Sequence, residues 1–519
     1  MVLTYDAIII GSGHNGLITA GYLAKAGLKV LVAERRDFVG GASVTEEFFP
    51  GYRFSHCSFS AHALQGKVVK DLELRKYGLD MYEISPRSFT PFPNNRHIVW
   101  WEEDLERTAR EMARLSEHDA RTFPEWTEFW RRAGDVVSSF FLTSPPTKSD
   151  LLEKAKETGD DEVLEKVFDS SIREIVDEFF EDDDIKGFMC ASAGPDEGPN
   201  EPGSAFILSH FRPTPSHSSG DSSEDEPTGL IRGGMGSLTT AMAKSFQNYG
   251  GDIITGVEVD NIIVRNNKSE GIRLKDGKEI TSKITISNAD PKRTYLKLVG
   301  DENLEQEFVK HIQNLKTRSA SMKLQFVLNE LPDFSSYLGK NYDPKYLGEV
   351  CIAPHPDAIQ KSWEEAISGK PTRNPIIFLQ NSSVYDTSMA PAGYYIMGVW
   401  TQFWPRHLKE GSWNEIRERE GEFIIDTISK FAPNFRKCIK HWIIFTPLDL
   451  EEKIGLTDGN IRHIDMITSQ MISNRPHYRS PITGLYLCGA GTHPGGEVTG
   501  APGHNAAQVI LEDFRQNKV

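Results

Sequence analysis

The chain has 519 residues, more than a single hydrophobic core usually spans, so we expect at least two domains. Hydrophobic residues make up 38% and charged residues 25%, which is ordinary for a globular protein. The formal net charge of −16 argues against a general nucleic-acid-binding protein, because neutralising phosphates requires a basic surface.

The five cysteines are far apart and include no C-x-x-C pair: they are Cys57, Cys190, Cys351, Cys438 and Cys488. This pattern indicates reduced thiols rather than a disulfide framework or a zinc site, and we predict no metal site. The start "MVLTYDAIIIGSG" lacks the basic and apolar regions of a signal peptide, and no apolar run approaches the length of a spanning helix. We therefore expect a cytoplasmic protein, with peripheral membrane contact left open.

The segment "YDAIIIGSGHNGLITAGYLAKAGLKVLVAE" has the order of a dinucleotide-binding βαβ unit. Residues 6–10 form a short apolar strand, and Gly11, Gly13 and Gly16 then give G-x-G-x-x-G before a predicted helix. A second apolar strand ends at Glu34. The helix N-terminus would face a pyrophosphate, and the glutamate would accept hydrogen bonds from a ribose.

A second glycine-rich segment, "GLYLCGAGTHPGGEVTGAPGHNAAQVILEDF", repeats the order of strand, glycine loop and helix. Residues 485–488 are the predicted strand, and residues 489–505 contain six glycines. Pro502 suits the first turn of the helix, where its missing N–H costs little. A helix N-terminus after a glycine loop is again the geometry of an anion or dipole site.

The middle of the chain shows a different organisation. Residues 66–190 are rich in helix-forming stretches, and the Pro/Ser/Asp/Glu-rich residues 212–229 are typical of a flexible acidic loop. A hairpin is predicted around Asp276–Gly277, and stretches such as "SMKLQFVLN" and "GYYIMGVWTQF" within residues 300–475 predict a second sheet. No second glycine fingerprint has the flanking strand and acidic residue that a nicotinamide-binding domain would need.

These motifs resemble one family. "GSGHNGL", "ERRDFVGGASVTEE", "ISNADP" and the C-terminal glycine-rich segment are similar to those of FAD-dependent oxidoreductases of the amine oxidase and phytoene desaturase (carotenoid desaturase)-like superfamily. Within the phytoene-desaturase-like branch, the chain resembles the pyridine nucleotide-disulfide oxidoreductase domain-containing protein 2 group. Ala42 departs from the pattern, since arginine often follows the second glycine pair in the family. The resemblance implies FAD as the cofactor.

The resemblance also implies the fold class and the domains. We expect an α/β fold in which a Rossmann-type FAD-binding domain with a parallel sheet is interleaved with an α+β substrate domain. The FAD-binding domain would comprise residues 1–65, 230–300 and 476–519. The substrate-binding domain would comprise residues 66–229 and 301–475.

In such proteins the second glycine pair lies near the cofactor, and the C-terminal loop points backbone N–H groups at the flavin ring. Those groups stabilise negative charge on the reduced flavin. The position of Val257 lends backbone contacts to the adenine. The predicted FAD contacts are therefore Gly11, Gly13, His14, Asn15, Gly16, Glu34, Arg35, Gly40, Gly41, Ala42, Val257, Gly489, Gly491, Gly496, Val498 and Gly500.

The predicted reaction is hydride transfer between an apolar, polyene-like or lipid-like substrate and flavin N5, in desaturation, saturation or isomerisation. Candidate proton-transfer residues are His493, Glu497 and His504 in the C-terminal loop, with Arg53 and His56 after the second glycine pair. Each has an alternative role in holding its loop by hydrogen bonds. A carbocation on a polyene also loses its proton with little help.

Two other function classes remain open at the level of sequence. One is a flavin oxidase of a small amine, and the other is a non-catalytic binder like the GDP-dissociation inhibitors of small GTPases, which share the fold. The intact glycines and Glu34 favour an enzyme. An aromatic cage over the flavin would favour amines, and a long apolar tunnel would favour polyenes. The electron acceptor, for which quinone and oxygen are candidates, and the oligomeric state are left open.

Overall fold

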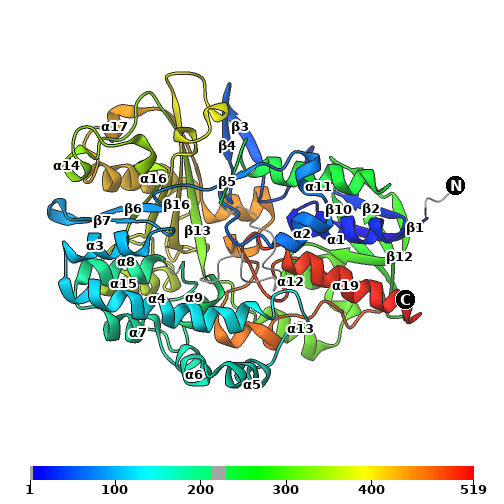
Figure 1. The fold of residues 1–519 in the computed structure, drawn as a ribbon. Helices are drawn as coiled ribbons and strands as arrows, with labels where there is room; N and C mark the ends of the chain where they lie inside the picture. The colour runs from blue at the N-terminus through cyan, green and yellow to red at the C-terminus, as the bar shows by residue number, and fades with distance from the viewer. Residues whose placement is uncertain (1–3, 193, 212–228) are drawn as a thin grey trace.

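The computed structural model describes residues 4–192, 194–211 and 229–519. Almost all of the predicted acidic loop at 212–229 therefore lies outside the described residues. Two seven-stranded sheets organise the chain, one on each side of Figure 1.

The first sheet has the order β10-β11-β12-β1-β2-β9, and β18 also pairs with β12. Its strands are β1 (Thr4–Ile10), β2 (Val30–Ala33), β9 (Asp252–Ile254), β10 (Val259–Arg265), β11 (Lys268–Leu274), β12 (Glu279–Ser287) and β18 (Leu485–Leu487). Strand β1 lies between β12 and β2 and is parallel to both, and β9 and β18 extend the parallel part. The predicted parallel sheet is confirmed, and the hairpin at Asp276–Gly277 joins β11 to β12.

Three long helices cover one face of this sheet, at the right of Figure 1. They are α1 (His14–Lys25), α11 (Met235–Asn248) and α19 (Ala501–Arg515), and α1 contacts both of the others. Their apolar sides share a buried core with the sheet and with the short helix α2 (Gly66–Asp71). The opposite face packs on the segment that contains α12 (Pro291–Arg293) and α13 (Gln306–Gln313).

The second sheet has the order β17-β13-β16-β15-β14-β6-β7. Its strands are β6 (Ser88–Pro91), β7 (His97–Trp100), β13 (Ala320–Leu328), β14 (Glu349–Ile352), β15 (Ile377–Gln380), β16 (Tyr395–Trp404) and β17 (Ile439–Phe445). One face packs on α14 (Ser335–Leu338), α16 (Trp413–Ser429) and α17 (Phe435–Cys438). Two small antiparallel ribbons lie outside these sheets. One pairs β3 (Thr45–Phe49) with β4 (Tyr52–Ser55), and the other pairs β5 (Met81–Tyr82) with β8 (Leu230–Ile231).

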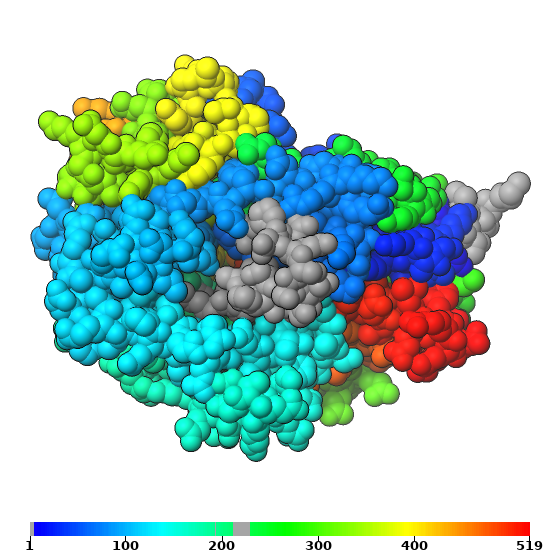
Figure 2. Space-filling model, viewed as in Figure 1, coloured from blue at the N-terminus to red at the C-terminus, as the bar shows by residue number. Residues whose placement is uncertain are grey.

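A helical layer lies beside the second sheet, at the lower left of Figure 1. Its helices are α3 (Leu105–Ala113), α4 (Glu117–Ser138), α5 (Lys148–Thr158), α6 (Asp161–Asp169), α7 (Ile172–Phe179), α8 (Asp183–Ser192), α9 (Phe206–Phe211) and α15 (Pro356–Ile367). Their core is built around buried tryptophans, among them Trp126 and Trp130. Figure 2 shows the blue segment after β4 crossing the face of the molecule between its two halves.

Among the helices that the structure describes, none combines the length and the apolar character needed to cross a bilayer. The domain boundaries given above remain predictions.

Candidate functional site

The first glycine loop joins β1 to α1. The helix begins at His14 with Gly13 as its N-cap, has no side-chain cap, and has no acidic residue in its first turn. Its N-terminal N–H groups are therefore suited to an anion. A Cβ on Gly16 would lie 2.4 Å from the backbone oxygen of Gly11, so only glycine lets the helix approach the loop this closely.

Glu34, at the end of β2, is buried and connects to the same loop. Its carboxylate accepts hydrogen bonds from the backbone N and Oγ of Ser12 at 2.9 and 2.7 Å, and from the backbone N of Arg36 at 2.9 Å. Val257 donates its backbone N–H to the Glu34 carbonyl at 3.0 Å. Two residues predicted to contact the adenosine half of FAD are thus neighbours.

The second glycine pair lies against the first loop. Gly13 and Gly40 form a parallel β-bridge, and the backbone N–H of Gly40 donates to the carbonyl of Ser12 at 3.0 Å. Gly41 has φ of +57°, and a Cβ there would lie 3.1 Å from Gly13 Cα. These contacts form a backbone-lined cradle that side chains would fill.

Arg35 and Ala42 flank that cradle. Arg35 donates to the carbonyl oxygen of Lys453 at 2.6 Å, so its guanidinium has a partner within the protein. The carbonyl of Ala42 accepts from the backbone N–H of Ser58 at 3.2 Å. Their predicted contact with FAD stays a prediction.

The C-terminal glycine loop meets the first loop directly. Gly503 in α19 donates its backbone N–H to Asn15 Oδ1 at 3.3 Å, and its carbonyl accepts from Thr19 Oγ1 at 2.9 Å. A Cβ on Gly503 would lie 2.5 Å from the Asn15 carbonyl. Helices α1 and α19 therefore begin side by side, which brings the two glycine loops to one place.

His14 links the same two loops through its ring, which hydrogen-bonds to the backbone of Glu497. Burial lowers the pKa of His14 to about 4, so the ring is neutral at physiological pH. Its Nε2 is buried and has no hydrogen-bond partner among the described residues. An unsatisfied buried nitrogen here is consistent with a bound ligand.

The other predicted positions in this loop are also closely packed. Val498 is buried in the core around α1. At four glycines an added Cβ would clash with a neighbouring side chain: Gly489 with His463, Gly491 with Pro291, Gly496 with Arg462, and Gly500 with Ile18.

The three candidate proton-transfer residues of the C-terminal loop have different hydrogen-bond partners. Glu497 accepts two hydrogen bonds from Arg462, at 3.0 and 2.9 Å. His493 Nε2 bonds to the carbonyl of Phe140 at 2.9 Å, and burial lowers the pKa of His493 to about 4. His504 Nδ1 bonds to its neighbour Asn505 at 2.8 Å. Each has its own partner, and a catalytic role for any of them stays a prediction.

Arg53 and His56 also have partners. Arg53 donates to the carbonyl of Gly233 at 3.5 Å. His56 Nδ1 pairs with Glu46, which in turn pairs with Arg36 at 2.6 Å. These contacts help to fix the ribbon of β3 and β4. His56 Nε2 is buried and has no hydrogen-bond partner among the described residues, and a proton-transfer role for Arg53 or His56 stays a prediction.

Asn288, which follows β12 in the "ISNADP" motif, was not among the predicted contacts. Its backbone N donates to Ile10 O at 3.0 Å, and its Nδ2 donates to Gly11 O at 3.4 Å. A Cβ on Gly13 would lie 2.7 Å from that Nδ2. Its place directly after a parallel strand beside β1 was the signal that could have identified it.

Lys323 on β13 was also missed by sequence reasoning. It is 1% exposed, and its Nζ lies 4.2 Å above the centre of the Phe59 ring. Burial lowers the pKa of Lys323 to about 7. Across the strand pair it faces Trp400, which stacks on Phe378 with ring centres 5.0 Å apart.

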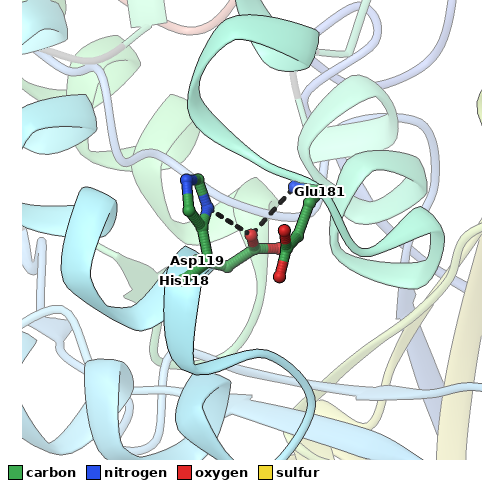
Figure 3. A group of neighbouring side chains, drawn as sticks. All are labelled: His118, Asp119 and Glu181. Carbon is green, nitrogen blue, oxygen red and sulfur yellow. Dashed lines mark hydrogen bonds and ion pairs between the residues drawn. The ribbon is translucent and has the colours of Figure 1, made fainter.

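His118, Asp119 and Glu181 come together outside this region, with potential ligand atoms within 4.8 Å of one another (Figure 3). Both carboxylate oxygens of Asp119 accept backbone N–H groups, from Glu181 at 2.8 Å and Asp182 at 3.1 Å. These bonds join the start of α4 to the turn before α8. They give the carboxylate a structural role, and the group carries no metal assignment.

The glycine cradle, the uncapped start of α1 and the unsatisfied His14 nitrogen fit FAD, which these loops would hold. A parallel Rossmann-type sheet whose glycine loop meets a second glycine loop from far along the chain defines an FAD-dependent oxidoreductase. The model of the flavin-containing amine oxidoreductase family matches residues 16–326, and the chain belongs to that family.

Three relatives match nearly the whole chain. Mouse pyridine nucleotide-disulfide oxidoreductase domain-containing protein 2 is 33% identical and covers 98% of this chain and 94% of its own length. One of the subunits of limonene dehydrogenase from Castellaniella defragrans is 26% identical, covering 99% and 95%. The lycopene-forming phytoene desaturase of Pantoea ananas is 25% identical, covering 98% and 99%. The resemblance inferred from the motifs is confirmed.

Solved structures agree on the fold. An oxidoreductase from Methanosarcina mazei superposes with a TM-score of 0.63 at 18% identity, covering 98% of this chain and all of that one (100%). A putrescine oxidase gives a TM-score of 0.61 at 12% identity, covering 99% of both chains. The predicted fold class is therefore confirmed.

Proposed function

We propose that this protein transfers hydride between an apolar, isoprenoid-like or lipid-like substrate and N5 of FAD, in desaturation, saturation or isomerisation. The names of two relatives, limonene dehydrogenase and phytoene desaturase, support an apolar substrate. The observation that carries the proposal is the match to these two relatives over nearly the whole chain, and the aromatic row of Phe59, Trp400 and Phe378 beside the predicted FAD loops would supply the apolar contacts. Phe59 and Trp400 lie with ring centres 6.4 Å apart.

The chain around Phe59 connects the two ends of the predicted cofactor site. Ser58 donates to the carbonyl of Ala42, next to the second glycine pair, at 3.2 Å. Gln65 donates to the carbonyl of Thr499, in the C-terminal loop, at 3.0 Å. An aromatic side chain carried by this segment is well suited to contact an apolar substrate close to the flavin.

Bound FAD would supply a hydride acceptor, and the protein's own groups would orient the partners. Arg462 holds Glu497, and with it the loop predicted to close on the flavin ring. The aromatic row would orient the apolar substrate and exclude water. His493 has a buried Nδ1 without a hydrogen-bond partner among the described residues, so it can accept a proton at that atom.

The amine-oxidase alternative is less well supported. The aromatic row is the one feature that would favour an amine, whereas limonene dehydrogenase and phytoene desaturase, which match nearly the whole chain, are named for apolar compounds. We propose a cytoplasmic enzyme whose reduced flavin passes its electrons to a quinone or to oxygen.

The proposal is tested by anaerobic mixing of the holoprotein with a panel of isoprenoid hydrocarbons, lipids and small amines. We expect the flavin absorption band to bleach with an apolar compound, and mass spectrometry to find a product lighter by two hydrogens. Bleaching by amines alone would contradict the proposal.

A further inference from the structure

Arg475 lies in the segment before β18, against the C-terminal glycine loop. It is 1% exposed, and a Cβ on Gly495 of that loop would lie 3.6 Å from its Cζ. Its Nε and Nη2 both donate to the carbonyl of Ala490, at 3.2 and 2.7 Å. The guanidinium is therefore fixed directly on the loop that is predicted to close on the flavin ring.

The acceptors that the described residues offer this guanidinium are all backbone carbonyls. Beyond Ala490, Nη1 donates to Gln470 at 3.2 Å, and Nη2 donates to Arg462 at 3.0 Å and to Ile464 at 3.4 Å. Carbonyl groups satisfy N–H donors but carry no net charge. Within the described part of the chain, the positive charge of Arg475 therefore has no carboxylate at hydrogen-bond distance.

The carboxylates whose charge acts on Arg475 are already paired with other arginines. Asp196 pairs with Arg462, and Asp465 accepts from Arg318 Nε at 3.0 Å. Burial lowers the pKa of Arg475 to about 9, which leaves the guanidinium protonated at pH 7. The loop therefore lies against a buried positive charge without a counter-charge of its own.

The other titratable side chains that face Arg475 are neutral at pH 7. Burial lowers the pKa of His463 to about 3 and that of His493 to about 4, and it also lowers that of His210. Burial raises the pKa of Tyr478 well above its ordinary value. None of these groups supplies an anion. A negative charge formed across the loop would therefore interact with the cation with little screening, because the site is buried.

The bonds to Ala490 also orient the next peptide N–H. In a trans peptide, which this one is, the carbonyl and the following N–H point in opposite directions. Because the Ala490 carbonyl points at Arg475, the N–H of Gly491 points away from the guanidinium. This N–H has no backbone acceptor among the described residues, and Gly491 is one of the predicted flavin contacts.

We propose that Arg475 makes the flavin easier to reduce. A hydride adds two electrons and one proton, so the ring gains one negative charge, which the buried guanidinium would stabilise. Its bonds to Ala490 would hold the Gly491 N–H toward the ring. Arg475 acts through the loop and is a positioning residue without contact to substrate. The inference rests on the proposed function, because it places the C-terminal loop at the flavin and names a residue that favours hydride acceptance.

The test measures the midpoint potential of the bound flavin in Arg475→Gln, by dithionite titration against a reference dye and without substrate. We expect the equilibrium constant for two-electron reduction to fall about tenfold or more, which corresponds to a potential lower by about 30 mV. Arg475→Lys keeps the positive charge, so at pH 6 it should keep most of the potential.

Arg479→Gln is the matched control. Arg479 lies in the same segment and pairs with Asp513 at 2.7 Å, but its side chain is 49% exposed. Water and salt screen a charge at this position, so its loss should leave the potential unchanged. Circular dichroism and the FAD content of each variant check that it is folded and loaded.

The lysine variant keeps the test decisive if Arg475→Gln does not fold or does not hold FAD. A buried lysine loses its proton far more readily than an arginine. The potential of Arg475→Lys should therefore fall progressively below that of the unsubstituted protein between pH 6 and pH 8. A constant, lower potential across this range would overturn the proposal, since the charge would then have no effect.

An unchanged potential in folded, FAD-loaded Arg475→Gln would also overturn it. So would equal falls in the glutamine and lysine variants at pH 6, because the shape of the side chain and not its charge would then set the potential. No substrate enters these measurements. A flavin that responds to Arg475 as expected, but that no apolar compound reduces, would therefore contradict the proposed function alone.

Discussion

Arg462 holds Glu497 by two hydrogen bonds, from Nε at 3.0 Å and from Nη2 at 2.9 Å, although 35 residues separate them in the chain. The same guanidinium pairs with Asp196 and donates to the carbonyl of Gly194 at 2.9 Å. Arg462 thus ties the C-terminal glycine loop to the turn after α8. The side chain of Arg462 is 3% exposed, whereas that of Glu497 is 36% exposed.

The first prediction concerns this ion pair. Arg462→Met should lower the free energy of unfolding by about 3–5 kcal/mol, because it leaves the buried Asp196 carboxylate without its counter-charge. Glu497→Gln should cost only about 1 kcal/mol, since its side chain is partly solvated and the amide can still accept a hydrogen bond. Urea denaturation of the holoproteins, with the FAD content of each, measures both effects.

Arg131→Met is the control for loss of an exposed ion pair. Arg131 bridges Glu128 and Asp135 on the outer side of α4 and is 54% exposed. Its loss should change the free energy of unfolding by no more than about 1 kcal/mol. Equal costs for the Arg131 and Arg462 variants would show that the buried network does not stabilise the fold.

The second prediction tests the close approach of α1 to the first glycine loop. Gly16→Ala places a methyl group 2.4 Å from the backbone oxygen of Gly11, so we expect an unfolding cost of about 1–3 kcal/mol and loss of FAD. Absorbance of purified protein gives the FAD content, and thermal melting gives the stability.

Gly21→Ala in the same helix is the matched comparison. Its Cβ would meet only the flexible end of Leu72, at 3.1 Å, and alanine favours a helix interior over glycine by about 1 kcal/mol. This variant should keep FAD and near-normal stability. If both variants retained FAD, the assignment of the first glycine loop to the FAD site would be wrong.

The third prediction is a loss of stability in acid. Burial lowers the pKa of His14 and His493 to about 4 and that of His463 to about 3, from an ordinary value of 6.5. Between pH 6.5 and these values the unfolded chain binds more protons than the native one, so stability falls as the pH falls. Melting temperatures measured from pH 7 to 4 should decline, and His463→Asn should flatten the decline. An unchanged slope in this variant would exclude His463 as a contributor.

The fourth prediction concerns Lys323 and the change in protein stability between neutral and alkaline pH. Because burial lowers its pKa from 10.5 to about 7, the unfolded chain holds a proton on this lysine between those values and the native protein does not. The destabilisation caused by the buried amine is therefore greatest below pH 7 and fades toward pH 10.5. Lys323→Met should raise the melting temperature more at pH 6.5 than at pH 9.5. A pH-independent change would contradict a buried, titrating amine.

The sequence predicted the parts of the site that local motifs specify. Gly11, Gly16 and Glu34 occur within one βαβ unit, where the order of strand, loop and helix is readable from neighbouring residues. The C-terminal loop was readable for the same reason. That the two glycine loops lie together was implied only by the family resemblance. The structure explains it by the contacts of Gly503 in α19 with Asn15 and Thr19 in α1.

The residues that were missed depend on distant partners. Alternation along β13 places Lys323 on the polar face of the strand, a face that is normally solvated. The strand is instead buried along its whole length, so the sequence did not predict that this lysine is buried. Arg462 lies in a segment without regular strands or long helices, and its importance arises from Asp196 and Glu497, which are remote in sequence. Pairing across such distances leaves no periodic signal in a single chain.

The contact between Asn15 and Gly503 spans 488 residues, which has a consequence for biosynthesis. The ribosome releases the first glycine loop early, yet the loop that completes the site emerges only after nearly all the intervening chain has been made. The side of α1 that packs on α19 therefore lacks this partner until synthesis is nearly complete. A chain cut short before residue 500 would lack α19 and the contact of Gly503 with Asn15, and with them one side of the predicted flavin site.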